Sequence, residues 1–241
     1  MNNIIANIKK PYIIGAVILL VVISGFFVYE HEYSPKAKYQ KGLHYYKEKN
    51  YQKALPLFEE AAKHNYAPAE EKLGHMYLKG WGVPQDTDKA VYWFKKAAKQ
   101  GNAEAEVALG HIYLTTAVFN TVISNMFSNP YGKSIATEKY PKALYWLKKA
   151  AEQGNAEAEN YLGVMYGNGL GVPQDYNKAL YWLKKAAEQG YAKAENNLGN
   201  MYANGLGVPQ DYNKAVYWYK KAAEQGNAEA KANLERLESD H

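Results

Sequence analysis

The chain has 241 residues, of which 22% are charged and 47% are hydrophobic, and its formal net charge is +5. This composition excludes a largely disordered chain. The positive charge is almost entirely lysine, because Arg236 is the only arginine. Arginine is the residue that most often forms two-point hydrogen bonds with phosphates and bases, so the sequence predicts no nucleic acid partner. The absence of cysteine excludes disulfides and thiolate metal sites.

The first predicted element is an apolar run over residues 12–29. Its 18 residues would form a helix of roughly 27 Å, about the thickness of a bilayer core. Lys9 and Lys10 precede the run, which favours a cytoplasmic tail over residues 1–11 and a translocated bulk. No small-residue cleavage site follows, so an uncleaved signal anchor is favoured over a cleaved signal peptide. We therefore predict a single-pass protein of a bacterial inner membrane, with its C-terminal domain in the periplasm.

A repeat with a period of 36 residues follows the apolar run. Leu-Gly pairs and tryptophans recur at this spacing, except for one step of 53 residues. The positions are Leu73, Leu109, Leu162 and Leu198 for the pairs, and Trp93, Trp146, Trp182 and Trp218 for the tryptophans. A fixed period in this range predicts a stack of supersecondary units.

Each unit is predicted to be a pair of helices. In the last complete unit, Leu198, Met201 and Tyr202 share one face of the first helix, and Gly199 is small enough for its partner helix to approach closely. A loop rich in glycine follows, and Asp211 is placed to cap the second helix. A glycine of left-handed conformation is expected to end that helix.

The repeated motif carries a family resemblance. Leu-Gly-x-x-Tyr, Gly-x-Gly-Val-x-x-Asp, Lys-Ala-x-x-Trp and Lys-Ala-Ala-x-Gln-Gly together resemble the Sel1-like repeat, a relative of the tetratricopeptide repeat. The resemblance implies an all-α fold, a right-handed α/α solenoid of helical hairpins whose first helices line a concave groove. We expect a linker over 30–37, a degenerate hairpin over 38–66 with Asn65 in place of a glycine, repeats over 67–102, 103–155, 156–191 and 192–227, and a capping helix over 228–241.

The second complete repeat contains an insertion of 17 residues near residues 115–137. The inserted segment lacks the glycine loop, and residues 129–132 predict a turn. Six apolar residues share one face of a predicted helix: Val118, Phe119, Val122, Ile123, Met126 and Phe127. One interpretation is that this stripe packs on its own solenoid. The other is that it contacts a partner or the membrane surface, since insertions in repeat arrays often lie on the binding face.

Polar positions that differ between repeats are the other candidate site. Asn160, Tyr161, Asn196 and Asn200 occupy such positions in the first helices, so the resemblance places them in the concave groove. There they would hydrogen-bond a protein partner. The alternative is ordinary surface variation.

The sequence contains no phosphate loop, dinucleotide motif, nucleophile elbow or His-Glu-x-x-His zinc motif. A metal shared by His75 and His111 is disfavoured, because stacked helices lie about 8–10 Å apart. A glutamate recurs once per repeat, which indicates a structural role, since catalysis needs a residue only once. Lysine pairs such as Lys184 with Glu188 are interpreted as solvated pairs four residues apart, in preference to a basic stripe. We predict no enzyme, no metal and no small-molecule cofactor.

The sequence therefore predicts a membrane-anchored scaffold that binds a protein partner. The family resemblance adds a narrower alternative, a periplasmic immunity protein that neutralises a secreted antibacterial effector such as a type VI phospholipase. An assembly factor for an envelope machine is a third hypothesis. A hydrolase is disfavoured, because the hydrolase-like members of the family are rich in disulfides and this chain has no cysteine.

Overall fold

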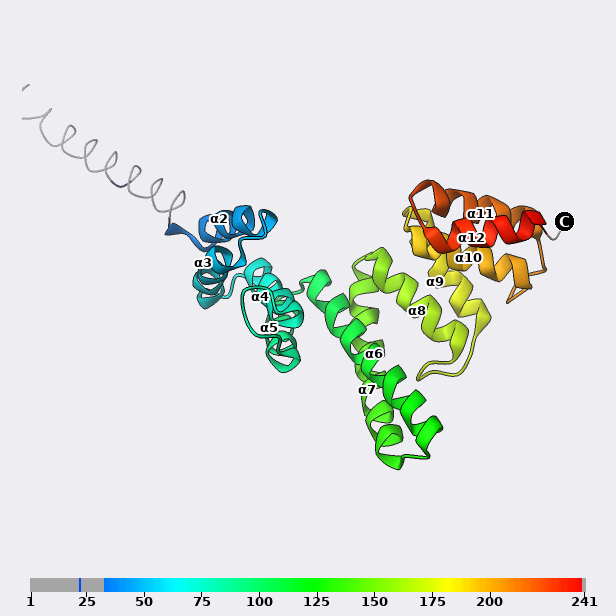
Figure 1. The fold of residues 1–241 in the computed structure, drawn as a ribbon, viewed down its shortest axis with the longest axis horizontal. Helices are drawn as coiled ribbons and strands as arrows, with labels where there is room; N and C mark the ends of the chain where they lie inside the picture. Colours follow the sequence, from blue (N-terminus) through cyan, green and yellow to red (C-terminus); the bar gives the residue numbers. More distant parts are fainter. Residues whose placement is uncertain (1–21, 23–32, 240–241) are drawn as a thin grey trace, which may run out of the picture. The chain divides into compact units, whose positions relative to one another are not determined.

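The structure is a computed structural model, and it describes residue 22 and residues 33–239. The predicted cytoplasmic tail and membrane anchor lie outside the described residues, except for Val22. The described part consists of helices joined by turns and loops and contains no strand, which confirms the all-α fold class (Figure 1).

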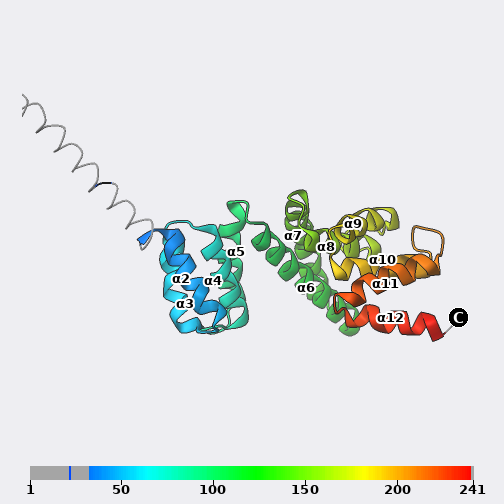
Figure 2. The same ribbon diagram turned by 90° about the horizontal axis from the view of Figure 1, so that it is seen from above.

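The chain divides into two compact units, residues 1–102 and residues 103–241. The described helices of the first unit are α2 (Pro35–Lys47), α3 (Tyr51–Lys63), α4 (Ala67–Lys79) and α5 (Thr87–Lys99). Those of the second unit are α6 (Ala103–Phe127), α7 (Pro130–Glu152), α8 (Ala156–Asn168), α9 (Tyr176–Glu188), α10 (Ala192–Asn204), α11 (Tyr212–Glu224) and α12 (Ala228–Ser239). Within each unit every helix packs against the next one in the chain, as Figure 2 shows for α10, α11 and α12.

Each hairpin is closed by the glycine of its Leu-Gly pair. A Cβ atom added to Gly163 in α8 would lie 2.5 Å from Cγ of Leu183 in α9, so a larger residue does not fit. The two helices therefore approach closely at this point. The same contact recurs as Gly74–Phe94, Gly110–Leu147 and Gly199–Tyr219, and Gly42, which follows a lysine in the first hairpin, makes it with Phe58. This confirms the predicted role of Gly199.

A buried ion pair joins the two helices of each complete hairpin. The carboxylate of Glu159 is fully buried, with Lys185 Nζ 2.9 Å away, and it accepts a hydrogen bond of 2.8 Å from Gln189 Nε2. Lys185 Nζ also lies 5.2 Å from the ring centre of Trp182. Equivalent lysine and glutamine contacts serve Glu70, Glu106 and Glu195. The recurring glutamate therefore has the structural role that its recurrence predicted.

The lysine pairing itself differs from the prediction. Two adjacent lysines recur in the second helix of each complete hairpin. The second of the two contacts the buried glutamate of the facing helix, as Lys185 does. Among the described residues, Lys184 and Glu188 form no ion pair, so the predicted contact four residues along the same helix was wrong. The buried carboxylate is the stronger attractor, because it is removed from water.

Local signals in the loops behave as predicted. Asp211 caps α11 by accepting a hydrogen bond of 3.0 Å from the backbone N–H of Lys214. That bond is the first-listed reason why the pKa of Asp211 lies below its ordinary value, and the Lys214 side chain adds to it. Asn65 has a φ of 55°, which confirms that asparagine takes the left-handed position that glycine holds in later repeats.

The hairpin of α6 and α7 is longer than the others. α6 has 25 residues and α7 has 23, whereas the helices of the next two hairpins have 13 each. Twelve further residues lengthen α6 by roughly 18 Å, and Figure 1 shows the pair projecting past α8 and α9. The turn lies at Ser128 and Asn129, and Pro130 begins α7, so the turn predicted over residues 129–132 was placed too late.

Candidate functional site

The extended part of α6 forms one wall of an apolar groove. The other wall is α8, and Leu170 from the loop after α8 closes one side. The groove has a volume of about 510 Å³. Its lining includes Val118, Phe119 and Val122 from α6 and Asn160, Tyr161 and Val164 from α8. The structure thus brings together residues from both sets of predicted site residues.

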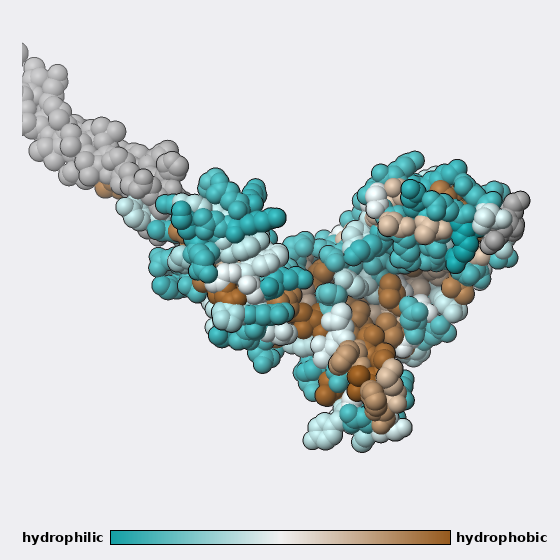
Figure 3. All heavy atoms as spheres, viewed as in Figure 1, coloured by the Kyte–Doolittle hydropathy of each residue, from teal (hydrophilic) through white to brown (hydrophobic). Residues whose placement is uncertain are grey.

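The apolar stripe on α6 is exposed along most of its length. Phe119 is 65% exposed and Phe127 is 67% exposed, and Val122 and Met126 are exposed as well. Val118 and Ile123 are half-buried. Figure 3 shows these apolar side chains as a brown patch over α6 that continues toward α8. Most of the stripe is therefore not covered by its own solenoid. This leaves it free to contact a partner or the membrane surface, which was the second interpretation of the insertion.

The opposite face of α6 is held by α7. The hydroxyl groups of Thr121 and Tyr140 lie 3.1 Å apart, and Ser124 Oγ donates a hydrogen bond of 2.8 Å to the carbonyl of Asn129. A Cβ atom added to Gly132 would lie 2.6 Å from the carbonyl oxygen of Asn120, so the two backbones are in close contact. Contacts with α7 and the turn before it therefore hold α6 on the face opposite the groove. The apolar face of α6 points toward α8 and solvent.

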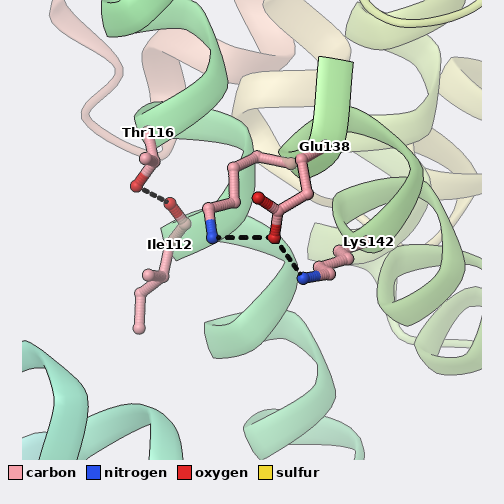
Figure 4. A network of polar contacts seen from close by, with 5 residues as sticks. Ile112, Thr116, Glu138 and Lys142 are labelled. Atoms are coloured by element: carbon pink, nitrogen blue, oxygen red, sulfur yellow. Dashed lines mark hydrogen bonds and ion pairs between the residues drawn. The ribbon is translucent and has the colours of Figure 1, made fainter. Parts of the chain in front are cut away.

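Polar contacts near the base of the long hairpin lie within its individual helices. Glu138 on α7 lies between Lys139, at 3.3 Å, and Lys142, at 2.5 Å (Figure 4). The hydrogen bond from Lys142 and then that from Lys139 hold the pKa of Glu138 below its ordinary value. Thr116 on α6 donates a hydrogen bond of 2.7 Å to the carbonyl of Ile112, within its own helix. The side chains that line the groove include no aspartate, glutamate, lysine or arginine.

Two aromatic side chains give the groove its polar edge. The rings of His111 and Tyr161 stack with their centres 5.4 Å apart. Burial raises the pKa of Tyr161 to about 12, and the charge of Glu157 adds to this effect. Tyr161 is therefore a neutral phenol at physiological pH. The groove offers an apolar floor with hydroxyl and amide groups beside it, which suits an uncharged apolar ligand surface.

The predicted asparagines fall into two groups. Asn160 borders the groove but is only 5% exposed, and its Oδ1 accepts a hydrogen bond of 2.9 Å from Asn197. Asn196 is 2% exposed and accepts a hydrogen bond of 3.1 Å from Asn233. Asn200 accepts a hydrogen bond of 2.7 Å from the Tyr219 hydroxyl and lines a separate hollow of about 190 Å³. Asn160 and Asn196 thus connect neighbouring first helices.

Sequence reasoning missed several groove residues. Leu114 and Thr115 lie on α6 before the predicted stripe, and Val164 and Leu170 face them from α8 and its loop. The signal was available for Leu114 and Thr115, which lie three or four residues before Val118 and therefore share its helix face. Val164 lies 36 residues before Asn200, at the same position of the repeat. Leu170 recurs in the glycine loop as Leu206, so the sequence offered no reason to assign it to a groove in one repeat only.

A further cluster of titratable groups lies on α4. Glu71 is nearly buried and lies 2.9 Å from His75 Nε2 and 3.0 Å from Lys72 Nζ. Burial would raise the pKa of Glu71, but the hydrogen bond from His75 and the charge of Lys72 outweigh it, so the pKa lies below its ordinary value. Among the residues that the structure describes, no three histidines, aspartates or glutamates converge in a way that could hold a metal ion.

Comparison with known proteins agrees with this architecture. The Sel1 repeat family model matches residues 33–66, 67–102, 131–155, 156–191 and 192–227, and the unmatched residues 103–130 hold all of α6. The crystal structure of a Sel1 repeat protein from Oxalobacter formigenes is 31% identical, with a TM-score of 0.71 over 88% of this chain and 85% of that chain.

Two further solved structures are less similar in shape. A protective antigen of uropathogenic Escherichia coli with an SLR fold is 33% identical, with a TM-score of 0.43 over 83% of this chain and 48% of its own. An immunity protein from Pseudomonas aeruginosa is 25% identical, with a TM-score of 0.48 over 79% of this chain and 67% of its own. Among curated proteins, none matches the chain significantly.

Proposed function

The chain belongs to the Sel1 repeat family, and we propose that it is a non-enzymatic scaffold that binds a protein partner in the groove between α6 and α8. The observation that carries the proposal is the exposed apolar face of α6, on which Phe119 is 65% exposed and lines the groove. Fully burying a side chain of this kind stabilises a complex by about 1.5–3 kcal/mol. The groove is unlike ordinary repeat surface, since the neighbouring hairpins end in short glycine loops instead.

The geometry of the groove suits an apolar helix of the partner. Its two walls are helices, and such grooves bind an amphipathic helix through side chains spaced three and four residues apart. Tyr161 would donate or accept a hydrogen bond at the edge as a neutral phenol. Asn160 already accepts a hydrogen bond from Asn197, so it contributes mainly to the shape of the wall.

We further propose that residues 12–29 anchor the scaffold in a bacterial inner membrane, with the repeats in the periplasm. The support is the length of the apolar run and the position of Lys9 and Lys10 before it. Among the described helices α6 alone meets the same criterion of length and apolarity. The helix buries residues 105–110 within its repeat, so it serves as a core helix there. A periplasm-dependent reporter fused after His241 should be active, and activity of a cytoplasmic reporter alone would contradict this orientation.

A narrower proposal is that the partner is a secreted antibacterial effector. A projecting hairpin with an apolar face has the shape to enter a cleft such as an enzyme's substrate site. Co-expression in the periplasm with an effector encoded by a neighbouring gene should then protect cells from that effector. Without protection, the general scaffold is favoured over the immunity role.

A site-specific photo-crosslinker tests the partner site directly. The crosslinking residue would replace Phe119, and a matched control would replace Tyr181, an aromatic residue on α9 that is 56% exposed. In intact cells we expect a discrete protein adduct from position 119 and none from position 181. Equal adducts from both positions, or an adduct from position 181 alone, would move the binding site away from the groove.

A further inference from the structure

The end of the long hairpin carries a second apolar surface, separate from the lining of the groove. Met126 and Phe127 at the end of α6 are 68% and 67% exposed, and Tyr131 in the first turn of α7 is 79% exposed. We call these three side chains the hairpin tip. None of them lines the groove between α6 and α8. The neighbouring hairpins have glycine loops at the equivalent place, so the repeat itself does not require an aromatic tip.

The charge around the hairpin tip is as unusual as its exposure. Residues 107–137 contain no aspartate or glutamate, whereas the whole chain has 24 acidic residues among 241. Lys133 is the one lysine in that segment, and it is exposed on α7 two residues after Tyr131. Acidic side chains would be repelled by anionic headgroups and are costly to remove from water. The segment therefore lacks the groups that would keep a projecting hairpin away from a lipid surface.

We propose that the hairpin tip inserts into the headgroup region of a phospholipid bilayer. Tyrosine, phenylalanine and lysine are residues that typically occupy this region, with the rings buried and the amine in contact with lipid phosphate. A single lysine adds little attraction, so the insertion depends mainly on Met126 and Phe127 and should vary little with salt. A protein hot spot is instead surrounded by contacts that exclude water, whereas these three side chains lie at a free end.

This inference rests on the membrane attachment proposed above, because the apolar run over residues 12–29 would keep the hairpin close to a bilayer. The two ideas can fail separately. Attachment predicts that the full chain floats with liposomes. Insertion predicts in addition that position 127 contacts lipid, which a chain held only by its N-terminal segment would not require.

Fluorescent labelling can measure the depth of the hairpin tip, because the chain has no cysteine of its own. Phe127→Cys would carry an environment-sensitive dye in full-length protein reconstituted at one copy per nanodisc of phosphatidylethanolamine and phosphatidylglycerol. The matched control is Tyr217→Cys on α11, where the native side chain is 54% exposed. Two quenchers are compared, iodide in water and a lipid labelled near its headgroup. A second variant adds Met126→Asp to Phe127→Cys.

We expect iodide to quench the dye at position 127 several-fold less than at position 217, and the labelled lipid to quench only position 127. Met126→Asp should return position 127 to water, and high salt should not. Equal iodide quenching at both positions in a chain that floats with liposomes would overturn the insertion and leave the anchor intact. Shielding from iodide without lipid quenching would also overturn it and indicate a protein contact. Failure to float would overturn the attachment and the insertion together.

Discussion

The hairpin of α6 and α7 and the hairpin of α8 and α9 share one construction at their base and differ beyond it. Both bury a glutamate against a lysine and a glutamine, and both place a leucine of the second helix against the glycine of the first. They diverge from residue 116 onward, where the first hairpin continues as two long helices and the second turns through glycines. The comparison teaches that the repeat contacts are enough to close a hairpin, so the added length is free to provide surface.

The largest expected effect is on the free energy of unfolding. It compares a methionine in the buried base with a methionine in the exposed extension. Met165 on α8 is fully buried and Met126 on α6 is 68% exposed. Met165→Ala should lower the free energy of unfolding by about 2–5 kcal/mol, because it removes packed atoms and leaves a cavity. Met126→Ala should change it by less than about 0.5 kcal/mol. Urea unfolding measures both, and similar losses would mean that the extension is part of the core.

A smaller effect tests the ion pair that the regular hairpins share. Lys185→Met removes the cation that faces the buried carboxylate of Glu159 and leaves only the hydrogen bond from Gln189. We expect a loss of about 1–3 kcal/mol, the range for a buried polar group that loses one partner, because Gln189 still donates a hydrogen bond to Glu159. The matched control is Lys184→Met, since Lys184 is exposed on the same helix. Thermal unfolding compares the two, and equal shifts would show that the pairing does not stabilise the hairpin.

The smallest expected effect is a pH dependence at the base of the long hairpin. Burial raises the pKa of Glu106, against the charge of Lys149, whose Nζ lies 3.6 Å away, and the hydrogen bond from Gln153. A raised pKa in the folded chain means that the contribution of Glu106 to stability is full below its ordinary pKa and is lost as pH rises through the folded pKa.

Glu106→Gln cannot titrate, so the variant should gain stability relative to the natural chain as pH rises from about 4 to about 7. Urea unfolding at several pH values gives the difference. A difference that stays constant, or that changes in the opposite direction, would show that the carboxylate of Glu106 is not disfavoured by its burial.

Sequence reasoning succeeded where a signal is local and repeated. The glycine of the Leu-Gly pair, the Asp211 cap and the left-handed Asn65 each depend on a few neighbouring residues, and the structure shows them as predicted. The turn after α6 was misplaced because Pro130 was treated as part of a turn. Proline is well tolerated in the first turn of a helix, and here Asn129 caps α7 just before it.

Contacts between elements distant in sequence were harder to predict. Asn160 and Asn196 vary between repeats in the way that surface residues do, yet each is buried in a hydrogen bond to an asparagine on the next first helix. Two amides can satisfy each other away from water, so variation alone does not show exposure. The groove shows the opposite case. The sequence indicated that Val118 and Phe119 contact some other surface. It did not indicate that they line the same groove as Tyr161, because that depends on how α6 and α8 pack in the fold.

The central claim is that the repeats provide the stability and the extension provides the binding surface. Its most direct test is the thermal unfolding of a variant in which the loop of residues 169–174 replaces residues 116–138, which restores the regular spacing. If the extension packs mainly on itself, the melting temperature should stay within a few degrees of the natural chain, since about 1 kcal/mol corresponds to roughly 2–4 °C in a chain of this size. A fall of more than about 10 °C would contradict the claim and assign the long hairpin to the core.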